Sequence, residues 1–267
     1  MVGSGAGAFM LIHGLLGSNR YWDGCYDRLA APGRRVIVPD LMGFGPSLRV
    51  ADGYGAASQA VHARSLLAEV GVTGPVVVGG HSFGSLVSLE LAALAPELVR
   101  GLVLFSPPIY TSKESARRHI RHSGAMARLG LTSGRLAEAV CNWHCRHRRL
   151  ARTITPLLSP RLPRAVAEDS AWHSWPAFEQ ALRSILDTDA ERLVDGLQCP
   201  VEFVMGEADP VIDIGEIAKI ARPLARTVTT VINADHHLPL KEVALCLGRL
   251  GEMWDRTTEL GGHPKIT

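Results

Sequence analysis

Short apolar runs recur along the chain, and each ends at a glycine, a proline or a polar turn residue. They cover residues 8–12, 35–38, 75–78, 102–105, 201–205 and 227–232. Most are rich in β-branched residues, and this pattern is typical of the buried strands of a parallel sheet. Longer amphipathic stretches predict helices over residues 21–31, 57–70, 85–94, 214–221 and 239–254. Strands that alternate with helices favour an α/β fold with a mostly parallel, twisted sheet flanked by helices.

The segment of residues 107–190 breaks this alternation, because it contains no clear strand. It predicts a helical cap inserted into a core made of residues 1–106 and 191–267. The segment holds 13 Lys and Arg against 7 Asp and Glu, although the whole chain has a net charge of only +2. This basic lobe is either a solvated helical surface or a cap that attracts an anionic substrate or an acidic carrier protein.

Composition argues against a nucleic-acid-binding, membrane-spanning or disulfide-rich protein. The 267 residues are 46% hydrophobic and 20% charged, which is enough to bury one large core and gives no reason to expect a nucleic-acid partner. No apolar stretch reaches the roughly 18 residues that a membrane helix needs, and the first residues do not resemble a signal peptide. Five cysteines in a chain of this length argue against a disulfide framework. We therefore expect a cytoplasmic protein with no membrane partner.

The sequence Gly80-His81-Ser82-Phe83-Gly84 lies between a predicted strand and a predicted helix. This G-x-S-x-G pattern, in this setting, is typical of a nucleophile elbow. Glycines on either side relieve crowding in a turn so tight that the serine adopts a strained backbone conformation. The serine oxygen then lies at a helix N-terminus, where backbone N–H groups stabilise negative charge.

With this elbow, the chain resembles the α/β-hydrolase fold superfamily, in its cap-bearing branch of esterase-like and lactonase-like enzymes. The resemblance runs from about residue 8 to residue 254, and five landmarks follow in the order of the family. They are His13-Gly14, the D-x-x-G-x-G-x-S loop at 40–47, the elbow at 80–84, the acid-bearing turn at 206–211 and the histidine loop at 235–240. One departure is that only about seven residues precede the first predicted strand. The usual N-terminal β-hairpin is therefore expected to be missing, Gly3 to Gly7 to form a loop, and the exposed sheet edge to favour a homodimer if the protein is not a monomer.

The resemblance implies a catalytic triad of Ser82, Asp209 and His236, in the family's order of serine, acid and base. Glu207 is the alternative acid, and His237 is the alternative base. Asp235 occupies the position before the histidine at which the family usually has glycine. An aspartate tolerates unusual backbone angles better than most residues, so the loop could keep its shape.

The resemblance also assigns the oxyanion hole to the backbone N–H groups of Leu15 and Phe83. His13 and Gly14, which precede Leu15, are predicted to support this loop beside the substrate. Three tryptophans of the insertion, Trp143, Trp172 and Trp175, could cover an apolar substrate pocket, although core packing explains them equally well.

One cluster could bind a metal ion, because residues 141–147 place two cysteines and two histidines on about two turns of a predicted helix. No second ligand cluster with zinc-finger spacing follows, so we interpret them as residues of a packed helix and expect no metal and no cofactor. The sequence thus predicts a serine hydrolase that cleaves an ester, lactone or thioester of a small molecule. Alternatives on the same fold are carbon–carbon bond hydrolysis, acyl transfer, a cofactor-free lyase or cyclase, and a slow-turnover ligand-binding protein.

Overall fold

The computed structural model describes residues 1–22, 25–48, 53–158, 162–221 and 227–261. Its centre is a seven-stranded sheet in the order β1-β3-β2-β4-β5-β6-β7, in which every neighbouring pair except β1 and β3 is parallel. The strands are β1 (Val2–Gly3), β2 (Gly7–Ile12), β3 (Arg34–Ile37), β4 (Val76–His81), β5 (Val99–Phe105), β6 (Val201–Gly206) and β7 (Thr227–Ile232). All six predicted strands are present, and the predicted α/β-hydrolase fold is confirmed.

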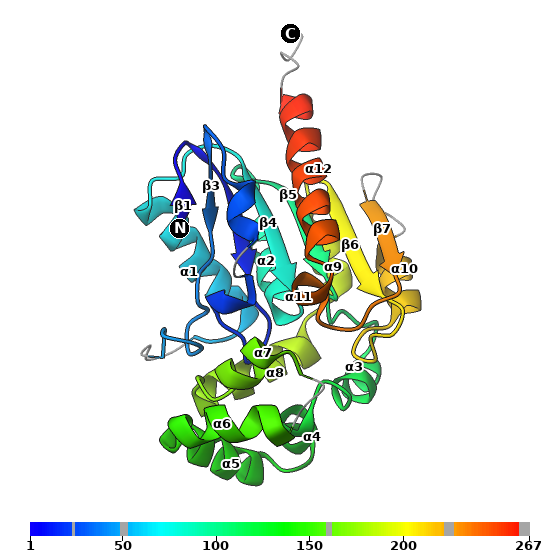
Figure 1. The fold of residues 1–267 in the computed structure, drawn as a ribbon. Coiled ribbons are helices and arrows are strands. Elements are labelled where there is room, and N and C mark those ends of the chain that lie inside the picture. The colour runs from blue at the N-terminus through cyan, green and yellow to red at the C-terminus, as the bar shows by residue number, and fades with distance from the viewer. Residues whose placement is uncertain (23–24, 49–52, 159–161, 222–226, 262–267) are drawn as a thin grey trace.

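Alternate residues of the central strands point to opposite faces of the sheet, as the period of a strand requires. In β2, Met10 and Ile12 belong to the hydrophobic core on one face, whereas Phe9 and Leu11 belong to the core on the other. Helices cover both faces in Figure 1, with α1 (Ala56–Glu69) and α2 (Phe83–Leu94) on one side and α12 (Val243–Gly261) on the other. Every residue of β2 and β4 is therefore buried.

The N-terminal segment differs from the expectation that residues 3–7 form a loop. Gly3 belongs to β1, where it pairs with Arg35, while Val2 pairs with Val36 of β3. The pairing is antiparallel and two residues long, so sequence periodicity has too few positions to reveal it.

Two helix predictions also need correction. Residues 21–31 do not form one α-helix; they contribute to the 3₁₀ turns η1 (Asn19–Trp22) and η2 (Tyr26–Leu29). Both turns bury aromatic rings under the sheet, where Trp22 and Tyr26 pack edge to face at 4.9 Å. The predicted helix over 239–254 is divided into α11 (Leu238–Lys241) and α12, because Glu242 has non-helical backbone angles.

Between β5 and β6 the described chain is helical, as the sequence predicts. Figure 1 shows most of these helices gathered beyond the end of the sheet to which β4 and β6 point. We call residues 107–190 the helical insertion. The helices that follow β5 are α3 (Lys113–Ile120), α4 (Ala125–Thr132), α5 (Gly134–Arg146), α6 (Arg148–Leu158), α7 (Arg164–Asp169), α8 (Trp175–Asp187) and α9 (Ala190–Asp195), and α10 (Ile214–Ala221) follows β6. Within the described residues, none of the helices is long and apolar enough to cross a membrane.

Candidate active site

The turn between β4 and α2 holds Ser82 in a strained conformation, with φ of 50° and ψ of −123°. The turn is tight because α2 starts directly against the end of β2. A Cβ atom on Gly84 would lie 2.4 Å from the carbonyl oxygen of Ile12, and one on Gly80 would lie 2.6 Å from the carbonyl oxygen of Gly84. Glycine is therefore required at both positions for this close approach.

Ser82, Asp209 and His236 come together from three separate parts of the chain. His236 Nε2 lies 3.0 Å from Ser82 Oγ, and His236 Nδ1 lies 2.8 Å from Asp209 Oδ2. Both distances are hydrogen bonds, so one imidazole connects the hydroxyl to the carboxylate. The arrangement can move a proton from the serine to the histidine and hold the resulting imidazolium beside a negative charge.

The carboxylate of Asp209 is buried, with its side chain completely shielded from solvent. Burial acts to raise its pKa, but the charge and hydrogen bond of His236, together with the backbone N–H of Val211 at 2.9 Å, lower it below the ordinary value. Asp209 is therefore an anion at neutral pH. Glu207, the alternative acid, is exposed to solvent.

The histidine loop places His237 away from the nucleophile. Its Nδ1 atom lies 3.3 Å from the hydroxyl of Tyr21 instead. Asp235 is not among the described residues with a positive φ, so the loop does not use the tolerance for unusual angles that we expected of it. Its carboxylate accepts a hydrogen bond from the His237 N–H at 3.0 Å and pairs with Lys241, and thus closes the turn through side-chain contacts.

The loop after β2 lies directly beside the nucleophile. A Cβ on Gly14 would be 3.0 Å from the Cβ of Ser82, so only a glycine allows this approach, and Leu15 follows it immediately. His13 is buried and neutral: its Nδ1 donates to the Gly14 oxygen at 2.8 Å, and its Nε2 accepts from the Leu41 N–H at 3.0 Å. Burial lowers the pKa of His13 to about 4, which fits this role as a support of the loop.

Sequence reasoning missed two residues of the site, Tyr21 and His81. Their rings stack at 4.4 Å, and His81 Nε2 lies 2.7 Å from the backbone oxygen of His236 and 3.1 Å from the Tyr21 hydroxyl. Because a carbonyl only accepts, His81 Nε2 must carry the proton, and the Tyr21 hydroxyl can then donate to His237. The available signal was the position of His81 directly before Ser82, which places it at the site whatever its role.

The three tryptophans of the insertion occupy different surroundings. Trp143 is 48% exposed and contacts His144 and His147. The guanidinium of Arg148 lies 5.2 Å from the centre of the Trp172 ring. Trp175 packs against the main hydrophobic core. The contacts described for the three rings do not include Ser82, and their predicted part in substrate binding stays a prediction.

A basic cavity of about 1180 Å³ lies within the insertion. Its lining includes Cys145, Trp172, the carboxylate of Glu168 and five arginines, of which Arg152 and Arg164 pair with Glu168: Arg146, Arg148, Arg149, Arg152 and Arg164. Its lining does not include Ser82, Asp209 or His236. The positive charge predicted for the insertion is thus partly concentrated on this cavity.

Comparison with known proteins agrees with the fold. A model of the alpha/beta hydrolase family matches residues 9–244. The chain is 25% identical over 259 residues to the probable lysophospholipase BODYGUARD 3 of Arabidopsis thaliana. The aligned region covers 86% of this chain and 52% of that protein. It is 38% identical over 106 residues to lipase LipV of Mycobacterium tuberculosis, covering 40% of this chain and 39% of LipV.

The chain spans about half, or less, of the length of these two relatives. Among solved structures, E-2-(acetamidomethylene)succinate hydrolase has the same fold, with a TM-score of 0.73 and 21% identity over 95% of this chain and 93% of that one. Because the family model matches residues 9–244, which is most of the sequence, the chain belongs to the alpha/beta hydrolase family.

Proposed function

We propose that this hydrolase cleaves an ester, lactone or thioester through an acyl-enzyme formed on Ser82. The observation that carries the proposal is the continuous contact from Ser82 Oγ through the imidazole of His236 to the buried Asp209 carboxylate. A serine hydroxyl is a poor nucleophile by itself, and this arrangement supplies both a base and a partner for the charged base.

In the proposed reaction, His236 Nε2 takes the Ser82 proton while Oγ attacks the carbonyl carbon of the substrate. The oxyanion then forms beside the N–H groups of Phe83 and Leu15, each of which is expected to lower the barrier by about 3 kcal/mol. His236 returns the proton to the departing alcohol or thiol. It next removes a proton from water, which attacks the acyl-enzyme, and then gives that proton to Ser82 Oγ as the acid departs.

The substrate class follows from the chemistry of the site and from the activities named for its relatives. Lysophospholipase and lipase are the activities named for BODYGUARD 3 and LipV, which supports a carboxylic ester as the bond that is cleaved. We propose that the helical insertion acts as a cap over the acyl pocket and selects the substrate. No step of this reaction calls for a cofactor.

The test is labelling of the protein with a fluorophosphonate, read by intact mass, beside hydrolysis of p-nitrophenyl esters of increasing chain length. The wild type should gain one adduct and hydrolyse esters, whereas Ser82→Ala should lose the adduct and roughly 10³-fold or more in turnover. Ser85→Ala is the matched control, because Ser85 is buried one helical turn away and bonds only to backbone carbonyls. A folded wild type that gains no adduct would reject the acyl-enzyme and favour a lyase or a ligand-binding protein.

A further inference from the structure

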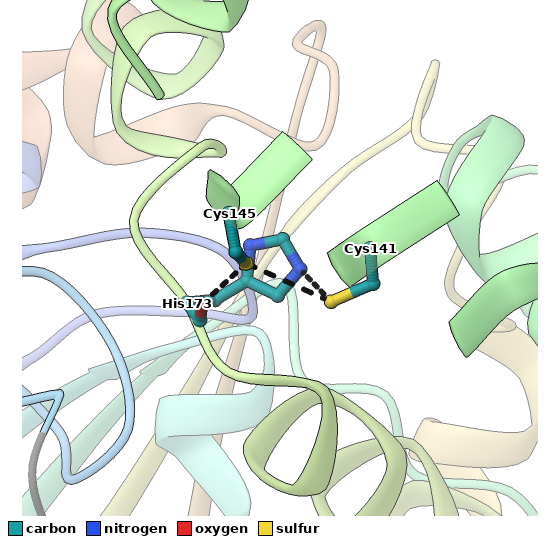
Figure 2. A group of neighbouring side chains, drawn as sticks. All are labelled: Cys141, Cys145 and His173. Carbon is teal, nitrogen blue, oxygen red and sulfur yellow. Dashed lines mark hydrogen bonds between the residues drawn. The ribbon is translucent and has the colours of Figure 1, made fainter. Parts of the chain in front are cut away.

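Two cysteines and one histidine converge in the helical insertion, outside the triad. Cys141 and Cys145 lie one turn apart on α5, and His173 lies on the segment between α7 and α8. The two sulfur atoms and one ring nitrogen of His173 all lie within 4.8 Å of one another. Figure 2 shows the three side chains together, with Cys141 Sγ at the His173 ring and Cys145 Sγ between Cys141 Sγ and the His173 carbonyl oxygen. Of the motif at residues 141–147, only the two cysteines take part, and the histidine of the cluster is 28 residues beyond Cys145.

The tautomer of His173 is fixed by its neighbour. His173 is 2% exposed, and its Nδ1 donates a hydrogen bond of 2.8 Å to the carbonyl oxygen of Ser170. Its Nε2 therefore has a free lone pair, which faces Cys141 Sγ at 2.8 Å. A histidine that ligates a metal in proteins almost always donates its other N–H to such a carbonyl or carboxylate.

Two of the three separations lie near those of a thiophilic metal site, and the third, between Cys145 Sγ and the ring nitrogen of His173, is within 4.8 Å. With Zn–S bonds of about 2.3 Å, two thiolates of a tetrahedral site lie roughly 3.8 Å apart, and Cys141 Sγ and Cys145 Sγ are 3.9 Å apart. A Zn–N bond of about 2.0 Å would require roughly 3.5 Å between sulfur and nitrogen. Cys141 Sγ would thus move away from His173 by less than about 1 Å, which a small rotation of its side chain provides.

Positively charged side chains lie on one side of the cluster. Cys145 lines the arginine-rich cavity, where the positive potential favours a negatively charged ligand. Thiolates with an imidazole are the ligand set of tetrahedral zinc sites, and this set is closed by a fourth ligand such as water.

From this geometry we propose that Cys141, Cys145 and His173 bind one zinc ion, with a water molecule or an anion from the basic cavity as the fourth ligand. Binding releases the two thiol protons, one of which Cys145 now donates to the carbonyl oxygen of His173. The metal would join α5 to the segment that carries His173. Backbone bonds of 2.8 Å and 3.0 Å join that segment to Gly45 and Gly43, so zinc would also tie α5 to the core.

The experiment is metal binding by the full chain, prepared reduced and without metal-affinity chromatography. Elemental analysis after zinc loading and gel filtration should give one zinc per wild-type chain. Cys141→Ser, Cys145→Ser and His173→Gln should each weaken zinc binding by at least tenfold in competition with a chelator. Cys199→Ser is the matched control, since Cys199 is a partly buried cysteine outside the cluster, and it should bind zinc like the wild type.

Cobalt provides a second measurement that a loss of folding cannot imitate. Co²⁺ in the wild type should give the intense visible bands of a tetrahedral ion and a sulfur-to-cobalt charge-transfer band in the near ultraviolet. Cys145→Ser should lose about half of the charge-transfer intensity while its far-ultraviolet circular dichroism stays unchanged. Wild-type protein that binds neither metal more tightly than Cys145→Ser does would overturn the proposal. So would charge transfer that keeps its full wild-type intensity in both Cys141→Ser and Cys145→Ser. Neither measurement depends on hydrolase activity, so the two proposals fail independently.

Discussion

The ring of His81 holds the backbone of His236, because its Nε2 donates to the His236 carbonyl oxygen at 2.7 Å. The residue directly before the nucleophile thus positions the residue that contacts it from the other side. Tyr21 stacks on His81 and bonds to the same nitrogen, which makes the contact rigid. The spacing between Ser82 Oγ and His236 Nε2 therefore depends on residues outside the triad.

His81→Phe should lower kcat about fivefold and leave KM nearly unchanged. The substitution keeps the stacked ring but removes the two hydrogen bonds of Nε2, to the His236 carbonyl oxygen and to the Tyr21 hydroxyl. The bond to His236 contributes roughly 1 kcal/mol, which corresponds to about fivefold in rate. Steady-state kinetics with a p-nitrophenyl ester would measure both constants. Tyr21→Phe keeps the His81 contact to His236 and should have a smaller effect. An unchanged kcat in His81→Phe would show that the carbonyl contact does not position the base.

His236→Ala should reduce turnover as severely as Ser82→Ala, by roughly 10³-fold or more, since the members of a triad act as a unit. His237→Ala should cost less than tenfold, because His237 contacts Tyr21 and not the nucleophile. Turnover numbers of the two variants, measured side by side, show which histidine is the base. A severe loss in His237→Ala with an active His236→Ala would move the base to His237.

Asp209→Asn should lower kcat by about 10⁴-fold, because an amide cannot balance the charge on His236 and favours the wrong tautomer. Glu207→Gln is the matched control: this carboxylate lies two residues away and is exposed, so its loss should change kcat less than twofold. The rate of fluorophosphonate labelling should fall only in Asp209→Asn. Near-normal labelling of that variant would place the essential acid elsewhere.

Gly84→Ala should destabilise the fold by at least 1–3 kcal/mol and abolish labelling of Ser82, because its Cβ would collide with the carbonyl oxygens of Ile12 and His13. Gly248→Ala serves as the control, since a Cβ there meets no atom within 4 Å. In α12 this alanine should stabilise the protein slightly. Urea unfolding and labelling measure the two effects. A stable, fully labelled Gly84→Ala would contradict the tight packing of the elbow.

Stability should decrease as the pH falls from about 6.5 toward 4. Burial lowers the pKa of His13 and His237 to about 4, and lowers that of His81 well below its ordinary value. In the unfolded chain these histidines take up protons near pH 6.5, whereas the folded chain does not. Unfolding therefore binds protons, and each histidine contributes up to about 1.4 kcal/mol per pH unit in this range.

The measurement is the urea midpoint between pH 7.5 and 4.5. The lowered pKa of Asp209 has a separate effect, since its stabilisation is lost only at a lower pH, as the folded carboxylate becomes protonated. His122→Gln, which removes an exposed histidine, should leave the pH dependence unchanged. A flat profile between pH 7 and 5 would show that these rings are protonated in the folded protein.

Local patterns predicted the sheet and the elbow because each has a signature within a few consecutive residues. Apolar runs bounded by turns identified six strands, and the glycines around Ser82 reflect a collision between neighbouring segments. The stacked pair of Tyr21 and His81 could not be predicted in this way, because 60 residues separate the two rings. His173 was missed for the same reason. Its partners lie on α5, and only the folded insertion brings them to the segment that carries His173.

The absence of a side chain at Gly84 has a consequence for which parts of the sequence can vary in evolution or in the laboratory. The start of α2 packs against the carbonyl oxygens of Ile12 and His13, so the position of the nucleophile is coupled to that of the loop that carries Leu15. The insertion begins two residues after Phe105, whose carbonyl oxygen accepts the Ser82 N–H at 2.9 Å. Its helices, from Lys113 to Asp187, carry none of the triad residues. Substitutions confined to these helices could therefore change substrate specificity while Ser82, Asp209 and His236 are kept.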